Sequence, residues 1–341
     1  MDDQSAYARA GVDLQAGQTA TNLMRAAVQS TYGPEVLSDV GSFGGLYDAS
    51  EVAAIEAPVL VASTDGVGTK TMVAARLGRW DSIGSDIVNH CLNDILVQGA
   101  QPLFFLDYIA SSKLDPQQMV TVVQGVAAAC RAAGVALLGG ETAEMPGVYR
   151  AGELDLVGTI VGVVERGRII NGARIQAGDL IVGLPSSGLH TNGYTLARAT
   201  LDGLDWSVQR PDLDGHSIGD TLLVPHRSYL APVRALLAQG IDLRGLAHIT
   251  GGGLLDNPLR VLPPNLACTL RRGRWPEPPI FGLIKREGGV SAAEMAHVFN
   301  LGLGMLLFLP QTDLARTLEL LPEAMFVGEV QPGTRAVYIM E

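Results

Sequence analysis

Apolar and polar positions follow one another along the chain in two patterns, one typical of buried strands and one of amphipathic helices. Short runs rich in Val, Leu, Ile and Phe predict strands at residues 59–62, 103–106, 135–138, 156–164, 179–184 and 305–309. Apolar and small residues at helical spacing predict helices at 14–30, 71–77, 80–99, 116–133 and 194–201. Asp115 followed by Pro116 is a favourable helix start, because the carboxylate can cap and proline fits the first turn. The pattern predicts a fold that mixes helices with sheets.

The chain is long enough for two domains. Its 341 residues can bury two cores of ordinary size. The strand at 156–164 completes a first half, and Arg166–Gly172 is suited to a crossing between domains. We therefore predict one domain at 1–169 and a second at 170–341.

Composition and charge narrow the class of protein. Apolar residues make up 47% and aromatic residues 5%, so Ala, Val, Leu and Ile must build the core. The net charge of −11 argues against nucleic acid or an anionic membrane as a partner. The three cysteines form no CxxC pair, which fits a reducing compartment, and no apolar run is long enough to span a membrane. These features predict a soluble cytoplasmic protein.

The turn at Ser63–Lys70 (STDGVGTK) lies between a predicted strand and a predicted helix. It combines the Asp65 carboxylate with two glycines, hydroxyl groups and a lysine. Glycines let a ligand approach the backbone, and a helix N-terminus favours anions. A carboxylate beside phosphates requires a cation between them, so the turn predicts a metal–nucleotide site. The alternative is a tight turn that Asp65 caps while Lys70 is solvated; the spacing is not that of a Walker A loop.

The predicted helix at 80–99 carries three polar residues on one face. Asp86, His90 and Asp94 are four residues apart, so they lie in one row beside the apolar stripe. Carboxylates in that position are costly unless they are solvated or paired with a cation. Asp94 is therefore a candidate metal ligand, and the alternative is a simple solvated face.

Three acids follow apolar runs of the first half. Asp65, Asp107 and Glu141 each come directly after a predicted strand, where ligand sites often gather. If Asp94 faces them, four carboxylates converge on one edge of the sheet. This convergence is the main prediction of a site.

Two further glycine-containing loops are candidates for binding phosphate, and residues 39–48, with Gly44 and Gly45, form another glycine-rich turn. The two candidate loops are residues 186–193 (SSGLHTNG) and residues 248–253 (HITGGG). A plain loop or a capped turn is the alternative for each. Two anion loops beside a metal site suggest two phosphorylated ligands.

These motifs resemble the phosphoribosylformylglycinamidine cyclo-ligase family over nearly the whole chain. The resemblance is carried by STDGVGTK at 63–70, NDILVQGA at 93–100, PLFFLDY at 102–108, GGETAEMPG at 139–147, SSGLHTNGY at 186–194, AHITGGG at 247–253 and FNLGLGM at 299–305. The turn alone also resembles thiamine-monophosphate kinase, selenophosphate synthetase and hydrogenase-maturation proteins. Selenophosphate synthetases need a reactive cysteine near the N-terminus, whereas the first cysteine here is Cys91. The hydrogenase-maturation protein ends in a reactive cysteine, whereas this chain ends Tyr338-Ile339-Met340-Glu341.

The resemblance implies a fold, a reaction and partners. The fold would be two α+β domains, an N-terminal mixed sheet with helices that forms a shared barrel in a homodimer and a C-terminal sandwich-like α+β domain. The N-terminal domain would bind ATP and Mg²⁺ and dimerise, and the C-terminal domain would complete the active site. The substrate would be formylglycinamidine ribonucleotide, cyclised to aminoimidazole ribonucleotide with release of ADP and phosphate. Another ATP-using kinase of the superfamily and a non-catalytic nucleotide-binding protein are the alternatives.

The resemblance also suggests roles for individual residues. Asp65 and Asp94 would bind Mg²⁺, and His190, Asp65 and Lys70 would act in catalysis. The residues assigned to binding nucleotide or substrate are Gly44, Gly45, Ser63, Thr64, Gly66, Gly68, Thr69, Asp107, Glu141, Ser187, Gly188, Thr191, Asn192, Gly251 and Gly252. Two positions depart from the family: Ala8 replaces an arm lysine, whose charge Arg9 would supply, and His90 replaces an apolar residue as a local variation.

Overall fold

The computed structural model describes residues 14–340, which divide into two compact units. Unit 1 takes the chain up to Ile95 together with Gln101–Gly167, and unit 2 takes Leu96–Ala100 together with Arg168 onward. Each unit has its own sheet and core. The functional roles assigned to residues 1–169 and 170–341 stay predictions.

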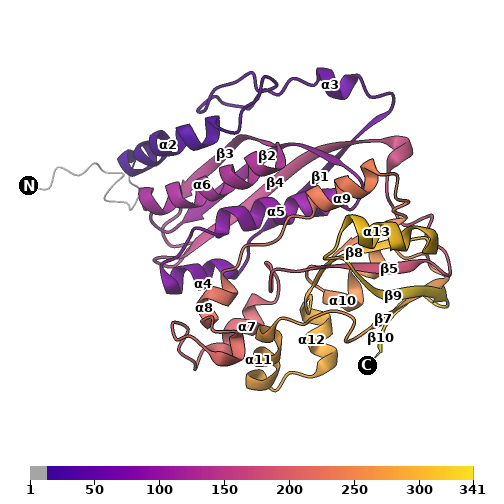
Figure 1. Ribbon diagram of the computed structural model, residues 1–341. Coiled ribbons are helices and arrows are strands. Elements are labelled where there is room, and N and C mark those ends of the chain that lie inside the picture. The colour runs from indigo at the N-terminus through magenta and orange to yellow at the C-terminus, as the bar shows by residue number, and fades with distance from the viewer. Residues whose placement is uncertain (1–13, 341) are drawn as a thin grey trace, which may run out of the picture. The chain divides into compact units, whose positions relative to one another are not determined.

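Unit 1 is built on a four-stranded mixed sheet of order β1-β4-β2-β3 (Figure 1). Strand β4 is antiparallel to β1 and β2, whereas β3 runs parallel to β2. The elements are α2 (Leu14–Gln29), α3 (Ser50–Ala53), β1 (Pro58–Gly66), α4 (Lys70–Leu77), α5 (Ile83–Leu96), β2 (Gln101–Ser111), α6 (Pro116–Ala133), β3 (Ala136–Glu144) and β4 (Leu154–Glu165).

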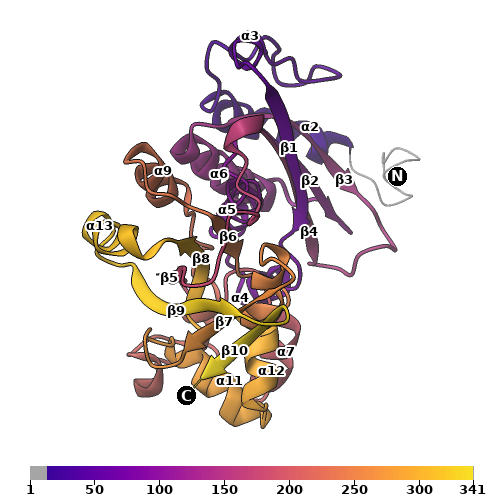
Figure 2. The ribbon, with the colours of Figure 1, turned by 90° about the vertical axis from the view of Figure 1, so that its right-hand side faces the viewer.

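Helices cover one face of this sheet. Helix α5 packs on β4, where Ile87 and Ile95 lie against Gly158 and Gly162, and α2 packs on α6. Asp115 caps α6 as predicted, accepting hydrogen bonds from two backbone N–H groups of the first turn. The opposite face carries no helix among the described residues of unit 1 (Figure 2), and Leu60 on it is 66% exposed.

Unit 2 has a six-stranded sheet of order β10-β7-β9-β5-β8-β6, in which only β10 and β7 are parallel. Strand β8 lies between β5 and β6 and is fully buried, as its uninterrupted apolar run predicts. The strands are β5 (Leu180–Pro185), β6 (Gly245–His248), β7 (Leu266–Arg271), β8 (Leu303–Leu309), β9 (Met325–Pro332) and β10 (Ala336–Met340). The α-helices are α7 (Tyr194–Leu201), α8 (Ile218–Leu222), α9 (Leu230–Ala238), α10 (Gly253–Asp256), α11 (Pro279–Gly288), α12 (Ala292–Val298) and α13 (Leu314–Leu320).

The predicted α+β architecture with a mixed N-terminal sheet is confirmed. The predicted ends of three strands of unit 1 are wrong. Strands β1, β2 and β3 continue to Gly66, Ser111 and Glu144, so Asp65, Asp107 and Glu141 lie within strands and not beyond them. Pairing with β2 holds the glycine-containing segment of β3 extended, although its composition alone indicates a loop.

Candidate active site

The glycine turn after β1 presents open backbone next to a carboxylate. Val67 is buried, and its N–H donates to the carbonyl of Leu156 on β4. Gly68 has φ +69° with no atom near its missing side chain, so the backbone can reach a ligand there. Thr69 precedes α4 without capping it by its side chain. The structure places the predicted ligand residues of this segment between the end of β1 and the start of α4. They are Ser63, Thr64, Asp65, Gly66, Gly68 and Thr69.

The structure brings Asp65 and Asp94 together, as the sequence predicts. Ser63 Oγ lies 3.3 Å from Asp65 Oδ2 and 3.4 Å from Asp94 Oδ2, so one hydroxyl contacts both carboxylates. The two aspartates are 38% and 27% exposed. Two partly buried carboxylates beside an open glycine turn can hold a divalent cation that also binds phosphate oxygens. The residues present therefore fit Mg²⁺.

His90 lies in the same cluster. Its Nε2 is 3.6 Å from Asp65 Oδ1 and 3.7 Å from Asp94 Oδ2. One ligand atom from each of the three residues lies within 4.8 Å of the others. The helical spacing of His90 and Asp94 is the signal that could have found this contact, because residues four apart share a helix face.

Lys70 lies in the interior, not beside the open turn. Its ammonium is 2.9 Å from the Asp86 carboxylate, and both side chains are fully buried. Burial lowers the pKa of Lys70, and the neighbouring charge of Asp86 opposes that effect. The structure therefore places the Lys70 ammonium away from a ligand at the turn, and the alternative of a solvated Lys70 is wrong, because Asp86 on α5 binds its charge inside unit 1.

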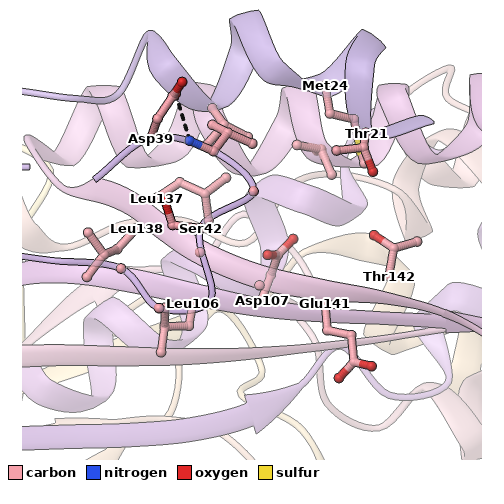
Figure 3. Close-up of a pocket in the computed structure, with 18 of the residues that line it drawn as sticks. Thr21, Met24, Asp39, Ser42, Leu106, Asp107, Leu137, Leu138, Glu141 and Thr142 are labelled. Atoms are coloured by element: carbon pink, nitrogen blue, oxygen red, sulfur yellow. Dashed lines mark hydrogen bonds between the residues drawn. The ribbon is translucent and has the colours of Figure 1, made fainter. Parts of the chain in front are cut away.

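The four carboxylates do not converge. Asp65 and Asp107 both pair with Gly158, so two strand spacings, or about 10 Å, separate them across the sheet. Asp107 points toward α2, whereas Glu141 points away from it on the other side of the strands (Figure 3). The cause is the register, because Glu141 is paired with Tyr108, one residue beyond Asp107, and neighbouring positions face opposite ways.

A cavity of about 770 Å³ lies beside Asp107 in unit 1. It is bounded by α2, the 39–45 segment and strands β2 and β3, and Gly44, Gly45, Asp107 and Glu141 are among its lining residues (Figure 3). This size suits a small organic ligand. Burial raises the pKa of Asp107 to about 7, so its carboxyl can donate or accept a hydrogen bond near neutral pH.

Two of the predicted loops meet in unit 2. A side chain at Gly251 would lie 3.3 Å from Asn192 Oδ1, which places the 186–193 loop against the 248–253 loop. Asn300 donates to the carbonyl of Gly188, and Asn257 donates to that of Gly251. The loops therefore hold Ser187, Gly188, Thr191, Asn192, Gly251 and Gly252 in one region.

His190 is buried in a group of three histidines. Its Nε2 accepts the Ser187 N–H at 3.1 Å, and its ring stacks on His226 at 4.0 Å. The Nε2 atoms of His226 and His248 are 3.0 Å apart. His190 has φ +63°, a strained conformation for a residue other than glycine. The sequence indicates His190 as an acid–base candidate but gives no sign of its partner His226, which is distant in the chain. Ala8 and Arg9 lie outside the described residues.

Both units match models of one protein class. Residues 48–164 match the N-terminal domain of AIR synthase related proteins, and residues 176–341 match the C-terminal domain. Among solved structures, E. coli HypE, a hydrogenase maturation protein, is similar with TM-score 0.67 and 18% identity, covering 95% of this chain and 93% of that one. Thiamine-monophosphate kinase from Stenotrophomonas maltophilia is similar with TM-score 0.64 and 17% identity, covering 94% and 95%. At such low identity the likeness shows the fold alone.

Curated relatives identify one family within this class. Phosphoribosylformylglycinamidine cyclo-ligase of Gloeobacter violaceus is 53% identical over 89% of this chain and 90% of its own length. The protein of the same name from Nitrosococcus oceani is 47% identical over 96% and 92%. The chain belongs to the phosphoribosylformylglycinamidine cyclo-ligase family, as its motifs predict. None of the helices in its described residues meets the length and hydropathy needed to cross a membrane.

Proposed function

We propose that the chain is a cytoplasmic enzyme that uses ATP and Mg²⁺ to cyclise formylglycinamidine ribonucleotide to aminoimidazole ribonucleotide, releasing ADP and phosphate. Membership of the cyclo-ligase family supports this reaction. The observation that carries it in this chain is the meeting of Asp65 and Asp94 beside the open glycine turn. A neighbour of the same fold, a HypE protein, is described in complex with ATP.

The chemistry explains why ATP is needed. An amidine nitrogen must attack the formyl amide carbon and expel its oxygen, and water, with a pKa of about 15.7, is a poor leaving group as hydroxide. Transfer of the γ-phosphoryl group to that oxygen makes phosphate the leaving group, with a second pKa of about 6. The amidine nitrogen then forms the new C–N bond, loses a proton, and the C–O bond breaks to release phosphate. About nine pKa units correspond to at most about 12 kcal/mol, which is the scale of enzymatic acceleration.

The residues of unit 1 would position the nucleotide. Asp65 and Asp94 would hold Mg²⁺, which neutralises the charge of the phosphates, while Ser63 orients both carboxylates. Backbone groups of Gly66 and Gly68 would contact phosphate oxygens, with Thr69 beside them, whereas the Thr64 hydroxyl contacts Thr159 on the other face of the sheet. Lys70 would act indirectly, by fixing the start of α4 against Asp86.

The other predicted residues would bind the organic parts and the second phosphate. Gly44, Gly45, Asp107 and Glu141 line the cavity of unit 1, which is large enough for a nucleoside. The two loops of unit 2, with Ser187, Gly188, Thr191, Asn192, Gly251 and Gly252, would hold a ribonucleotide phosphate. His190 is held by Ser187 and would fix the loop shape, with proton transfer as its further role.

We also propose that the protein is a homodimer. Leu60, Val157 and Val161 lie on the uncovered face of the unit 1 sheet, where Leu60 is largely exposed. A second copy of the same sheet would bury these side chains and close a shared barrel.

The test of function is ADP release by the purified protein with and without formylglycinamidine ribonucleotide, together with detection of aminoimidazole. We expect ADP and aminoimidazole in equal amounts, and ADP only when the substrate is present. ATP hydrolysis at the same rate without the substrate, or no aminoimidazole, would contradict the proposal.

A further inference from the structure

A buried imidazole lies under the two aspartates of the proposed metal site. His90 is 6% exposed, whereas Asp65 and Asp94 are 38% and 27% exposed. Its Nε2 faces one oxygen of each carboxylate, at 3.6 Å and 3.7 Å. The cluster is therefore not only acidic, because a nitrogen donor forms its inner side and oxygen donors form its open side.

These separations suit ligands of one ion. Around a metal with bonds of about 2.0–2.2 Å, neighbouring donor atoms lie about 2.9–3.6 Å apart. A direct N–H···O hydrogen bond would bring the same atoms to about 2.9 Å. The observed separations exceed that value and need only small side-chain rotations to reach coordination. Ser63 contacts both carboxylates and so keeps them close to the positions that coordination needs.

We propose that His90 is a third ligand of this metal site and that it shifts the site's preference from Mg²⁺ toward first-row transition ions such as Mn²⁺. This inference rests on the proposed function, because it concerns the ion that accompanies the nucleotide. Mg²⁺ favours oxygen donors, whereas imidazole adds affinity for transition ions, and Mn²⁺ also accepts carboxylates. Two carboxylates and one imidazole leave further positions for phosphate oxygens and water.

A different state of the same three residues predicts the opposite change in Mn²⁺ affinity. Protonated His90 would neutralise both carboxylates by itself and would compete with any cation. Removing His90 would then tighten the binding of Mn²⁺ and Mg²⁺ alike. The sign of the change in Mn²⁺ affinity separates the two arrangements.

The experiment measures Mn²⁺ binding to the full chain without nucleotide or substrate, from the EPR signal of free Mn²⁺. We expect His90→Leu to weaken Mn²⁺ binding at least about tenfold, as losing a metal's supporting groups commonly does, and to change Mg²⁺ binding much less. His297→Leu is the matched control, because His297 Nε2 also lies 3.6 Å from a carboxylate, that of Asp256, but both side chains are half-exposed. We expect this control to bind Mn²⁺ as the unchanged chain does.

A second readout reports the metal ligand directly. Electron spin-echo modulation of bound Mn²⁺ reports a directly coordinated imidazole nitrogen, and we expect that signal in the unchanged chain. Three other imidazoles cluster in unit 2, so the signal must also be absent from His90→Leu. No nitrogen signal in the unchanged chain, or Mn²⁺ binding in His90→Leu that is equal or tighter, overturns the inference. Cyclisation is assayed separately. A chain that forms aminoimidazole but binds Mn²⁺ independently of His90 refutes this inference and leaves the proposed function standing.

Discussion

Lys70 and Asp86 form a fully buried ion pair between α4 and α5. Replacing Lys70 by Met leaves the Asp86 carboxylate buried without its cation, which costs more than losing a surface pair. We therefore expect Lys70→Met to lower the free energy of unfolding by about 3–5 kcal/mol, measured by urea denaturation.

The double variant Lys70→Met/Asp86→Leu is the control for that prediction. Removing both charges replaces the pair by apolar groups, so we expect most of the stability to return. If Lys70→Met and the double variant are equally unstable, the loss comes from packing and not from an uncompensated charge.

Asp107 should make stability depend on pH. Because its pKa is raised from 3.8 to about 7, the folded state holds a proton that the unfolded state loses between those values. Its contribution to stability is therefore present below about pH 4 and is lost as pH rises to about 7. The full difference corresponds to about 4 kcal/mol, and access of water to the cavity reduces it to about 1–3 kcal/mol.

Asp107→Asn tests this dependence. We expect the variant to be more stable than the unchanged chain at pH 8 and about equally stable at pH 4, by urea denaturation at each pH. Equal stabilities at pH 8 would show that Asp107 is an ordinary solvated carboxyl.

The positions of the two aspartates of the proposed metal site could be predicted from the sequence for a simple reason. Asp65 lies at the end of β1 beside a glycine turn, and Asp94 lies on a helix face, so each position is fixed by local geometry. The burial of Lys70 could not be predicted from the sequence, because nothing local indicates that α5 turns Asp86 toward α4. Likewise, the divergence of Asp107 and Glu141 depends on the register of β2 and β3, which only the folded sheet determines.

Helices α5 and α6 touch where Gly84 of α5 lies against Gly125 of α6. A side chain at Gly84 would lie 2.1 Å from the Val122 carbonyl oxygen and 2.4 Å from the Val126 nitrogen. Backbone atoms cannot move aside cheaply, so we expect Gly84→Ala to lower the free energy of unfolding by about 1–3 kcal/mol or more, measured by urea denaturation.

Gly282→Ala in α11 provides the matched control, since the space around that helical glycine is open. Alanine favours helix over glycine by up to about 1 kcal/mol, so this variant should be as stable as the unchanged chain or more so. Equal effects of the two substitutions would refute the close contact of α5 with α6.

Elements with a strong local pattern were predictable, and those decided by pairing were not. Helix α7 and the capped start of α6 agree with the sequence prediction, because each is bounded by turn or capping residues. Strand β3 runs six residues past its apolar segment, since its backbone pairs with β2 irrespective of side-chain type.

For the whole molecule, the uncovered face of the unit 1 sheet should be the dimer interface. Leu60→Arg would place a charge in the middle of that interface, where it would be desolvated without a partner. We expect this variant to sediment as a monomer at concentrations where the unchanged chain is a dimer.

Val208→Arg is the control, because Val208 is similarly exposed, at 55%, but belongs to unit 2. It should remain dimeric. A monomeric unchanged chain, or a dimeric Leu60→Arg, would remove this face from consideration as the interface.

We expect Asp65 and Asp94 to hold jointly the cation that binds ATP for cyclisation. The most direct measurement is kcat/KM for aminoimidazole formation as a function of Mg²⁺ in Asp65→Asn, Asp94→Asn and the control Asp81→Asn, whose carboxylate is exposed outside the cluster. We predict that each of the first two loses at least about a hundredfold in kcat/KM and needs more Mg²⁺, while the control keeps its activity. Normal turnover and normal Mg²⁺ dependence in either cluster variant would contradict the account.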